Sequence, residues 1–219
     1  MAREKFDLIV FDWDGTLMDS TAAIAYAIQR VAEDLKMPVP DAKKASFVIG
    51  LGLLEAVRFI MPDLPLELQS KAIGLYRRYY LQESKKLTLF DGVKEMLADL
   101  SFRGYTLAVA TGKSRVGLNY DLKRSGLWDY FESSRCADET FSKPHPAMLQ
   151  ELMAELGKDA ERTVMIGDTT HDLQMAKNAE TKAIAVEYGA HPKNLLGELN
   201  PIYSADSVTA LHDWLIKNA

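Results

Sequence analysis

The fold of this chain is decided near its N-terminus by the stretch Asp7-Leu8-Ile9-Val10-Phe11-Asp12-Trp13-Asp14-Gly15-Thr16. Residues 7–11 form a short, mostly apolar run of the kind that makes a fully buried strand. Asp12 and Asp14 follow at alternate positions, so in an extended segment both carboxylates point to the same side. Open α/β sheets place their sites just past the ends of such strands. The stretch therefore predicts a core strand with two carboxylates converging at its end.

A cation is the expected partner of Asp12 and Asp14, because two close carboxylates repel each other. Mg²⁺ suits hard oxygen ligands and is commonly held by one or two carboxylates plus a substrate phosphate. A strand followed by an ordinary Asp-Gly turn is the competing interpretation, since both residue types are common in turns. The motifs farther along the chain separate these two interpretations.

Composition excludes several classes of protein. Hydrophobic residues make up 47% and charged residues 26% of the 219 residues, as in ordinary globular proteins. The net charge of -5 offers no basic field for nucleic acid or for an anionic membrane. No N-terminal signal-type segment and no membrane-spanning apolar stretch is present, and the single cysteine, Cys136, cannot form an intramolecular disulfide. We expect a cytoplasmic protein that is a monomer or a small homo-oligomer.

Periodicity predicts helices alone between the first strand and residue 86, and alternating strands and helices after that. The expected helices of the first block are residues 19–36, 41–47, 53–60 and 66–86. Strands are then expected at 105–110, 131–135, 163–168 and 182–186, and helices at 93–100, 114–126, 146–156, 170–179 and 207–218. Alternation of this kind indicates an α/β fold whose parallel sheet is covered on both faces.

The helical block inserted after the first strand is interpreted as a separate cap over the strand ends. The predicted division is a catalytic α/β core of residues 1–17 and 88–219 and a helical cap domain of residues 18–87. A lid of this kind can expel water from a site.

Polar residues stand at the ends of three expected strands. They are Asp12 with Asp14, Thr111 with Gly112, and Gly167 with Asp168. Because the carboxyl ends of parallel strands lie along one edge of a sheet, these groups can converge. Lys143, directly before Pro144, adds a positive charge. Such a set supplies a carboxylate nucleophile, a cation site, hydroxyl and amide donors and a lysine, which phosphoryl transfer requires.

Four segments resemble, in order, the motifs of the haloacid dehalogenase superfamily of phosphohydrolases, in the branch with a helical cap after the first motif. They are residues 11–17 (FDWDGTL), 110–112 (ATG), 143–144 (KP) and 166–172 (IGDTTHD). The resemblance covers essentially the whole chain and implies a Rossmann-like core with a helical cap. With four motifs in the family's order, the interpretation of residues 12–15 as an ordinary turn is set aside.

The resemblance also implies roles for single residues. Asp12 would attack phosphorus to form an aspartyl-phosphate, and Asp14 would act first as acid and then as base. Mg²⁺ would be held by the side chain of Asp12, the main-chain carbonyl of Asp14 and Asp168. Asp172 would bind the metal directly or through water, or would only cap its own helix.

Phosphate contacts are assigned in the same way. Thr111 and the amide of Gly112 would hold phosphoryl oxygens, and Lys143 would neutralise charge on the nucleophile and the phosphoryl group. Lys113 and Arg115 could reach the substrate from the core. The two histidines at 171 and 191 are interpreted as surface residues, and Cys136 as a buried or incidental thiol.

Reaction type follows from two further features of the resemblance. Asp14 argues against the dehalogenases, which lack this second acid, and Thr16 is typical of phosphatases where sugar-phosphate mutases usually carry valine.

Residues 111–115 (TGKSR) and 186–189 (VEYG) are similar to phosphoglycolate phosphatases. The loop at 50–52, where substrate contacts are expected, carries no charge. We expect a Mg²⁺-dependent phosphatase of a small phosphorylated metabolite; a pyrophosphatase, a nucleotidase, a phosphomutase and a phospho-accepting signalling domain stay open as alternatives.

Overall fold

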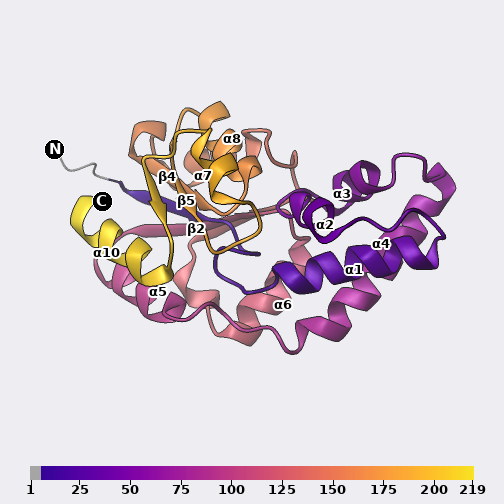
Figure 1. Ribbon diagram of the computed structural model, residues 1–219. Coiled ribbons are helices and arrows are strands. Elements are labelled where there is room, and N and C mark those ends of the chain that lie inside the picture. Colours follow the sequence, from indigo (N-terminus) through magenta and orange to yellow (C-terminus); the bar gives the residue numbers. More distant parts are fainter. Residues whose placement is uncertain (1–5) are drawn as a thin grey trace.

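A six-stranded parallel sheet forms the centre of the part that this computed structural model describes, residues 6–219 (Figure 1). The strand order is β3-β2-β1-β4-β5-β6, so that β1 lies in the middle. The strands are β1 (Leu8–Phe11), β2 (Thr106–Thr111), β3 (Ser133–Cys136), β4 (Thr163–Gly167), β5 (Lys182–Val186) and β6 (Tyr203–Ala205). The predicted α/β class with a parallel sheet is confirmed.

Register brings the ends of the three central strands to one level. Phe11 of β1 is paired with Val109 of β2 and with Ile166 of β4. The chain leaves the sheet within two residues of each of these positions, at Asp12, Thr111 and Gly167. The expected convergence of three polar strand ends at one edge of the sheet therefore occurs.

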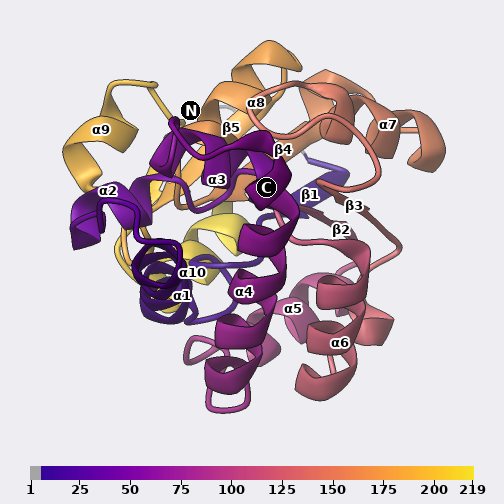
Figure 2. The same ribbon diagram turned by 90° about the vertical axis from the view of Figure 1, so that its right-hand side faces the viewer.

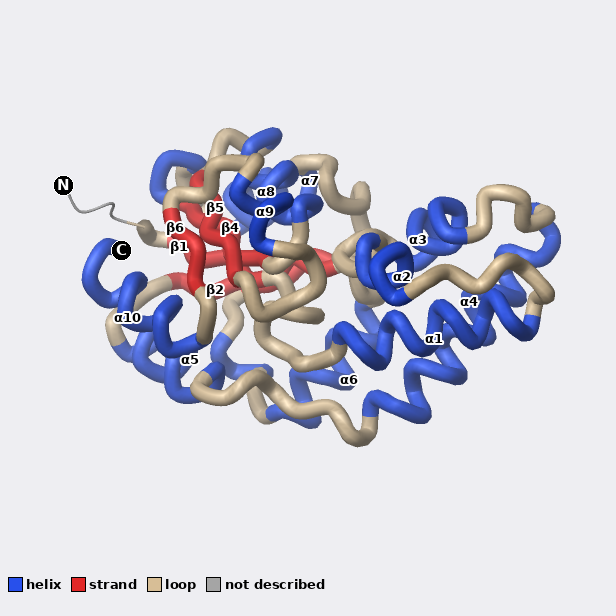
Figure 3. The backbone as a smooth tube through the Cα atoms, viewed as in Figure 1, coloured by secondary structure: helices blue, strands red, loops and turns tan. Residues whose placement is uncertain are grey.

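Helices cover both faces of the sheet because successive strand residues point to opposite sides (Figure 3). Ile9 and Phe11 pack into one hydrophobic cluster with α5, α6 and α10, whereas Leu8 and Val10 pack into another with α7 and α8. The helices are α5 (Val93–Phe102), α6 (Arg115–Ser125), α7 (Ala147–Leu156), α8 (Thr170–Asn178), α9 (Lys193–Gly197) and α10 (Val208–Asn218). Each of the two faces is thus sealed by its own apolar layer.

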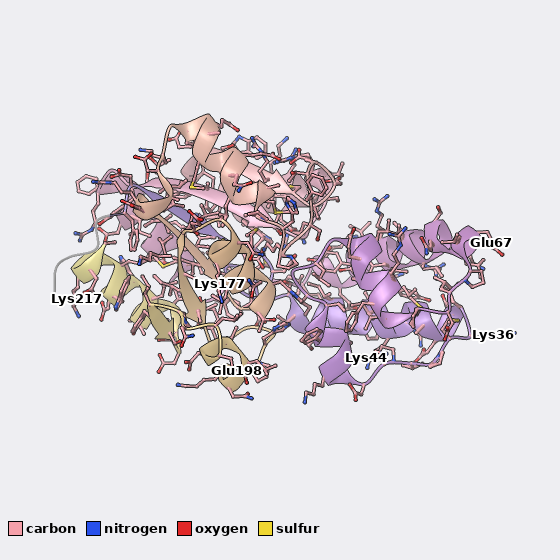
Figure 4. All side chains as sticks on the ribbon, turned by 90° about the horizontal axis from the view of Figure 1, so that it is seen from above. Lys36, Lys44, Glu67, Lys177, Glu198 and Lys217 are labelled. Carbon is pink, nitrogen blue, oxygen red and sulfur yellow. The ribbon has the colours of Figure 1, made fainter. Side chains whose placement is uncertain are left out.

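The helical block, defined here as residues 21–84, lies on one side of the sheet (Figures 1 and 4). It consists of α1 (Thr21–Asp34), α2 (Ala42–Phe47), α3 (Leu53–Ile60) and α4 (Leu66–Ser84). These helices share a hydrophobic cluster of their own, which includes Ile28, Val57 and Tyr79. Figure 2 looks onto the block, with α1, α3 and α4 in front of the sheet.

The predicted elements agree with the structure to within one or two residues at most boundaries. Gly126, expected as a helix cap, adopts a left-handed conformation with φ of 71° and ends α6. The elements α9 and β6 were not predicted, because one is a five-residue helix and the other a three-residue strand at the sheet edge. The weak strand expected at 131–135 lies at Ser133–Cys136. The predicted burial of Cys136 is confirmed.

Candidate active site

Asp12 lies directly after β1 and is almost fully buried, at 1% exposure. Its Oδ1 accepts hydrogen bonds from the Trp13 amide at 2.7 Å and lies 2.8 Å from Nζ of Lys143. Its Oδ2 has no hydrogen-bond partner anywhere in residues 6–219. Burial and the nearby carboxylates outweigh Lys143 and raise the pKa of Asp12. One oxygen is therefore fixed in place while the other keeps its lone pairs for a ligand.

Lys143 is a fixed cation between two carboxylates. Its Nζ lies 2.8 Å from Oδ1 of Asp12 and 2.6 Å from Oδ1 of Asp172, and its side chain is fully buried. Burial alone would lower the pKa of Lys143, but the two carboxylates hold it above its ordinary value. The lysine thus stays charged beside the carboxylate expected to act as nucleophile.

Asp168 follows β4 and is oriented by two donors. Its Oδ1 accepts from Oγ1 of Thr16 at 2.9 Å, and its Oδ2 accepts from the Ala190 amide at 2.7 Å. Gly15 approaches so closely, with φ of 82°, that a Cβ there would overlap the Asp168 carboxylate. Burial and the charge of Asp172 raise the pKa of Asp168 to about 7. The Thr16 hydroxyl, from the segment after β1, thus orients a carboxylate that follows the neighbouring strand β4.

Asp172 has donors on both of its oxygens. Its Oδ1 takes the bond from Lys143, and its Oδ2 accepts from the amide of Thr169 at 3.0 Å and from its hydroxyl at 2.6 Å. Thr169 and Asp172 form a capping box at the start of α8. The helix-capping role that the sequence left open for Asp172 is therefore present, together with an ion pair to Lys143.

The carboxylates of Asp12, Asp168 and Asp172 form one cluster, with an oxygen from each within 4.8 Å of the others. Within residues 6–219, the cation paired with this cluster is Lys143, which contacts Asp12 and Asp172. Hard oxygen ligands, an unpartnered buried carboxylate oxygen and an excess of negative charge fit a small divalent cation such as Mg²⁺. Asp14 does not contribute its carboxylate to this cluster.

The carboxylate of Asp14 has different surroundings. Its Oδ1 accepts from Oγ of Ser20 at 2.7 Å, from Nζ of Lys113 at 3.3 Å and from the Tyr80 hydroxyl at 3.5 Å. Ser20 is the N-cap residue of α1, but its side chain makes no cap bond and instead donates to Asp14. The two acids of the opening stretch are thus held by separate sets of partners.

Lys113 is buried at the edge of the site, where it forms ion pairs with two carboxylates. Its Nζ lies 3.0 Å from Oδ2 of Asp121 and 2.9 Å from the Tyr80 hydroxyl, besides its contact with Asp14. Burial opposes its charge, but Asp14, Tyr80 and Asp121 hold the pKa of Lys113 well above its ordinary value. Lys113 therefore orients Asp14.

Arg115, which was expected to be able to reach the substrate, lies outside this group in the structure. Its guanidinium pairs with Glu139 at 2.7 Å and donates to Oγ of Ser134 at 2.7 Å. It is not among the described residues that line the cavity at the sheet edge. The carboxylate of Glu139, 24 positions farther along the chain, holds the Arg115 side chain in this position.

Thr111 and Gly112 end β2 at the expected place. The Thr111 hydroxyl accepts from the Lys113 amide at 3.2 Å. A Cβ on Gly112 would overlap the carbonyl oxygens of Gly50 and Leu51, so the loop of the helical block lies directly on this glycine. The Gly52 amide in turn donates to Oγ of Ser142 at 2.7 Å. The loop at 50–52 is therefore attached to the core on two sides.

His171 and His191 are not the surface residues that the sequence suggested. His191 is buried, at 2% exposure, and its ring stacks on Phe47 with centroids 5.0 Å apart. Nε2 of His171 and Nε2 of His191 lie 2.9 Å and 3.0 Å from the Phe47 carbonyl oxygen. Burial lowers the pKa of both histidines. They contact the end of α2, a packing that their own sequence neighbourhood does not indicate.

A cavity of about 690 Å³ lies between the strand ends and the helical block. Asp12, Asp14, Thr111 and Gly112 border it from the core. Ser20 and Tyr80, which donate to Asp14, and Asp121, which pairs with Lys113, were not predicted as site residues. The spacing of Tyr76 and Tyr80, which places both on one face of a helix, was the available signal.

A buried carboxylate beside a fixed lysine, at the edge of a parallel sheet, suits phosphoryl transfer, and it defines the class of this protein as an α/β phosphatase. A family model described as haloacid dehalogenase-like hydrolase matches residues 9–186. The chain belongs to this family, as its motifs indicated.

Two relatives and one solved structure illustrate the likeness. The chain is 40% identical over 207 residues to "Probable phosphatase IndB" of Dickeya dadantii, covering 91% of this chain and 89% of that protein. It is 31% identical to a phosphoglycolate phosphatase of Vibrio vulnificus over the full length of both. The crystal structure of "a predicted phosphatase" from Clostridium acetobutylicum superposes with a TM-score of 0.86 at 25% identity, covering 97% of this chain and 99% of that one.

In residues 6–219, none of the helices combines the length and the apolar character that crossing a membrane would need.

Proposed function

We propose that this protein is a Mg²⁺-dependent phosphomonoester hydrolase that acts on a small phosphorylated metabolite through an aspartyl-phosphate. The observation that carries the proposal is the state of Asp12: Oδ1 is fixed by Lys143 and the Trp13 amide, while the buried Oδ2 has no partner within the described residues. A carboxylate held in this way is oriented for attack, and most of the barrier in phosphoryl transfer is met by positioning and charge.

The first half of the reaction transfers the phosphoryl group to Asp12. A carboxylate oxygen of Asp12 forms the bond to phosphorus as the ester P–O bond breaks, and Asp14 gives its proton to the leaving alcohol oxygen. Lys143 balances negative charge on the carboxylate and the phosphoryl oxygens. Thr111 and the Gly112 amide, at the end of the neighbouring strand, hold those oxygens in place.

The second half hydrolyses the aspartyl-phosphate. Asp14, now ionised, takes a proton from water as the water oxygen bonds to phosphorus, and the acyl–phosphate bond breaks to restore Asp12. Ser20 and Lys113 keep the Asp14 carboxylate in position for both proton transfers.

The metal would be held by Asp12, Asp168 and the main-chain carbonyl of Asp14, with Asp172 alongside. When bound, Mg²⁺ supplies positive charge next to the phosphoryl oxygens. The ion pair and capping box of Asp172 favour a supporting role for this residue.

The helical block is proposed to act as a cap domain of residues 18–87 over a core of residues 1–17 and 88–219. Two sets of contacts support this assignment of cap and core. Gly50 and Leu51 contact Gly112, and the Phe47 carbonyl contacts His171 and His191. These contacts cover the strand ends, and covering them would exclude bulk water from the aspartyl-phosphate.

Removal of the metal is expected to stop the reaction. We expect the purified protein to release phosphate from small phosphate monoesters with Mg²⁺, and to lose at least about two orders of magnitude in rate with a chelator, because the buried carboxylates then lack their counter-charge. Phosphate release measured with and without Mg²⁺ tests this. Full activity in chelator would contradict the metal assignment.

The same assay separates the alternatives. An isomerised sugar phosphate without phosphate release would indicate a phosphomutase, and release from pyrophosphate or nucleotides alone would indicate a pyrophosphatase or nucleotidase. A long-lived aspartyl-phosphate with no turnover would indicate a phospho-accepting signalling domain.

Asp14→Asn is expected to slow both halves of the reaction, each by about 10²–10⁴-fold, since the amide can neither donate nor accept the proton. An activated ester needs no protonation of its leaving group. With para-nitrophenyl phosphate we therefore expect a burst of about one nitrophenol per enzyme, followed by slow turnover. Stopped-flow absorbance measures the burst. Steady turnover at the wild-type rate would rule Asp14 out as acid and base.

A further inference from the structure

The cavity at the sheet edge is larger than a phosphoryl group on a two-carbon acid requires. Its volume of about 690 Å³ falls in the range of pockets that bind drug-sized ligands, roughly 300–1,000 Å³. Asp12, Asp14, Thr111 and Gly112 border the end next to the sheet. If the proposed function is correct, the phosphoryl group occupies this end, and the remaining volume is left for the alcohol part of the ester.

The wall that the helical block contributes is mainly apolar. It is formed by Ile24 and Ile28 of α1, Leu54 of α3, and Ile73 and Tyr76 of α4. The rings of Tyr76 and Tyr80 stack with centroids 5.8 Å apart and planes 10° from parallel. A wall of aliphatic side chains with a pair of aromatic rings favours an apolar or aromatic group over a polar one.

Charge in the cavity does not favour a second anionic group on the substrate. Among the described residues that line it, five are acidic and two, Arg77 and Lys113, are basic. Lys113 already pairs with Asp14 and Asp121, and Arg77 is exposed to solvent on α4. A carboxylate on the substrate would therefore give up its hydration without meeting a buried cation in return.

The side chains at the mouth of the cavity are also apolar, and they are exposed to solvent. Leu81 of α4 and Val116 and Tyr120 of α6 line it and are 53%, 80% and 44% exposed. Val116 and Tyr120 are four residues apart and share one face of α6. Large apolar side chains gathered at the rim of an apolar cavity mark a ligand-binding surface.

We propose that the substrate is the phosphate monoester of an uncharged alcohol with a bulky apolar or aromatic group. That group fills the cavity between α1, α3 and α4 and reaches the apolar rim on α6, while the phosphoryl group lies at Asp12. An ester whose remainder is a short carboxylate, such as phosphoglycolate, leaves this wall uncovered and meets acidic side chains. This inference rests on the proposed function and narrows its substrate class.

Three esters with primary-alcohol leaving groups test the inference: ethyl phosphate, 2-phenylethyl phosphate and phosphoglycolate. Their similar leaving groups keep intrinsic reactivity comparable. We expect kcat/KM for 2-phenylethyl phosphate to exceed that for ethyl phosphate by about tenfold or more, since the phenyl ring is buried against the apolar wall. Phosphoglycolate is expected to fall below both. Equal or faster hydrolysis of phosphoglycolate would overturn this inference and leave the proposed function intact, whereas no release from any of the three would overturn both.

A charge placed on the apolar wall provides the second test. Ile73 is half-buried and lines the cavity, yet it lies outside the hydrophobic cluster that the described residues of the block form. Ile73→Lys should lower the ratio of kcat/KM for 2-phenylethyl phosphate over phosphoglycolate by about tenfold or more. The control is Leu66→Lys at the exposed start of the same helix, outside the cavity, which should keep the wild-type ratio.

A wild-type ratio in Ile73→Lys would overturn the placement of the apolar group. Thermal unfolding of the variant shows whether it is folded. Leu54→Lys on α3, which is also half-buried and lines the cavity, provides the same measurement from a second helix if Ile73→Lys does not fold.

Discussion

Asp12→Asn is expected to abolish turnover, lowering kcat by at least about four orders of magnitude, as removal of a nucleophile does in other covalent mechanisms. The carboxamide has the shape of the carboxylate and can keep the 2.7 Å bond from the Trp13 amide. It is a poor nucleophile, however, and cannot form an aspartyl-phosphate. Phosphate release under saturating substrate measures the loss, and hydrolysis at the wild-type rate would exclude Asp12 as the nucleophile.

Stability separates a chemical defect in Asp12→Asn from a folding defect. In the metal-free protein, Asp12, Asp168 and Asp172 lie together and, among the described residues, are paired with Lys143 alone, so neutralising one acid relieves repulsion between like charges. Lys143 keeps its 2.6 Å partner in Asp172. We therefore expect the midpoint of thermal unfolding in chelator to equal or exceed that of the wild type. Asp19→Asn is the matched control, because Asp19 is exposed and should keep full activity.

The fold and the convergence of strand ends were predictable because both depend on short-range patterns. An apolar run followed by Asp12 and Asp14 identifies the central strand, and a parallel sheet then requires the ends of β2 and β4 to lie beside it. The positions of proline and glycine predicted the ends of the helices in the block for the same reason, because these residues restrict the backbone of their immediate neighbours. Lys143 was accessible to sequence analysis only through its place in the family's motif order.

Side-chain direction was not predictable in the same way. Arg115 follows the phosphate-site residues in sequence, but its long, flexible side chain forms an ion pair with Glu139. His191 has a polar neighbourhood in the sequence, yet it is buried by Phe47, which lies 144 residues away along the chain. The partners of Asp14 are Ser20 at the start of α1, Tyr80 of α4 and Lys113 after β2, so the composition of that cluster depends on how the helical block and the core are packed.

The apolar wall of the cavity likewise depends on tertiary packing and was not predictable from the sequence. Its apolar wall uses residues such as Ile24 and Ile73, whose helical spacing alone fits a core position equally well. Only the packed structure shows that Ile73 faces open volume rather than the cluster of the block. Substrate choice is therefore the part of the function that depends most on tertiary structure, whereas the chemistry of the reaction depends on motifs that the sequence carries directly.

Lys143→Met is expected to destabilise the metal-free protein by about 3–5 kcal/mol, the usual cost of removing one partner from a buried ion pair. Methionine keeps the length of the side chain but removes the cation that, in the described part of the chain, pairs with the cluster of Asp12, Asp168 and Asp172. Turnover should fall by at least about two orders of magnitude, because the charge beside the nucleophile is lost. Chemical unfolding in chelator measures the free energy of unfolding, and Lys177→Met, at an exposed position of α8, is the control.

The loss of stability in Lys143→Met should depend on pH in a defined direction. Burial already raises the pKa of Asp168 to about 7 and that of Asp12 above its ordinary value, and removing the lysine should raise both further. Between the unfolded-state pKa of about 4 and the raised native values, the native state binds more protons than the unfolded state. Stability of the variant relative to wild type should therefore decline as the pH rises through about 7 and above, where Asp168 of the wild type loses its proton and that of the variant keeps it. Mg²⁺ should reduce this difference by replacing the missing positive charge, and a difference that is constant across pH and unaffected by Mg²⁺ would show that Lys143 does not balance the charge of this cluster.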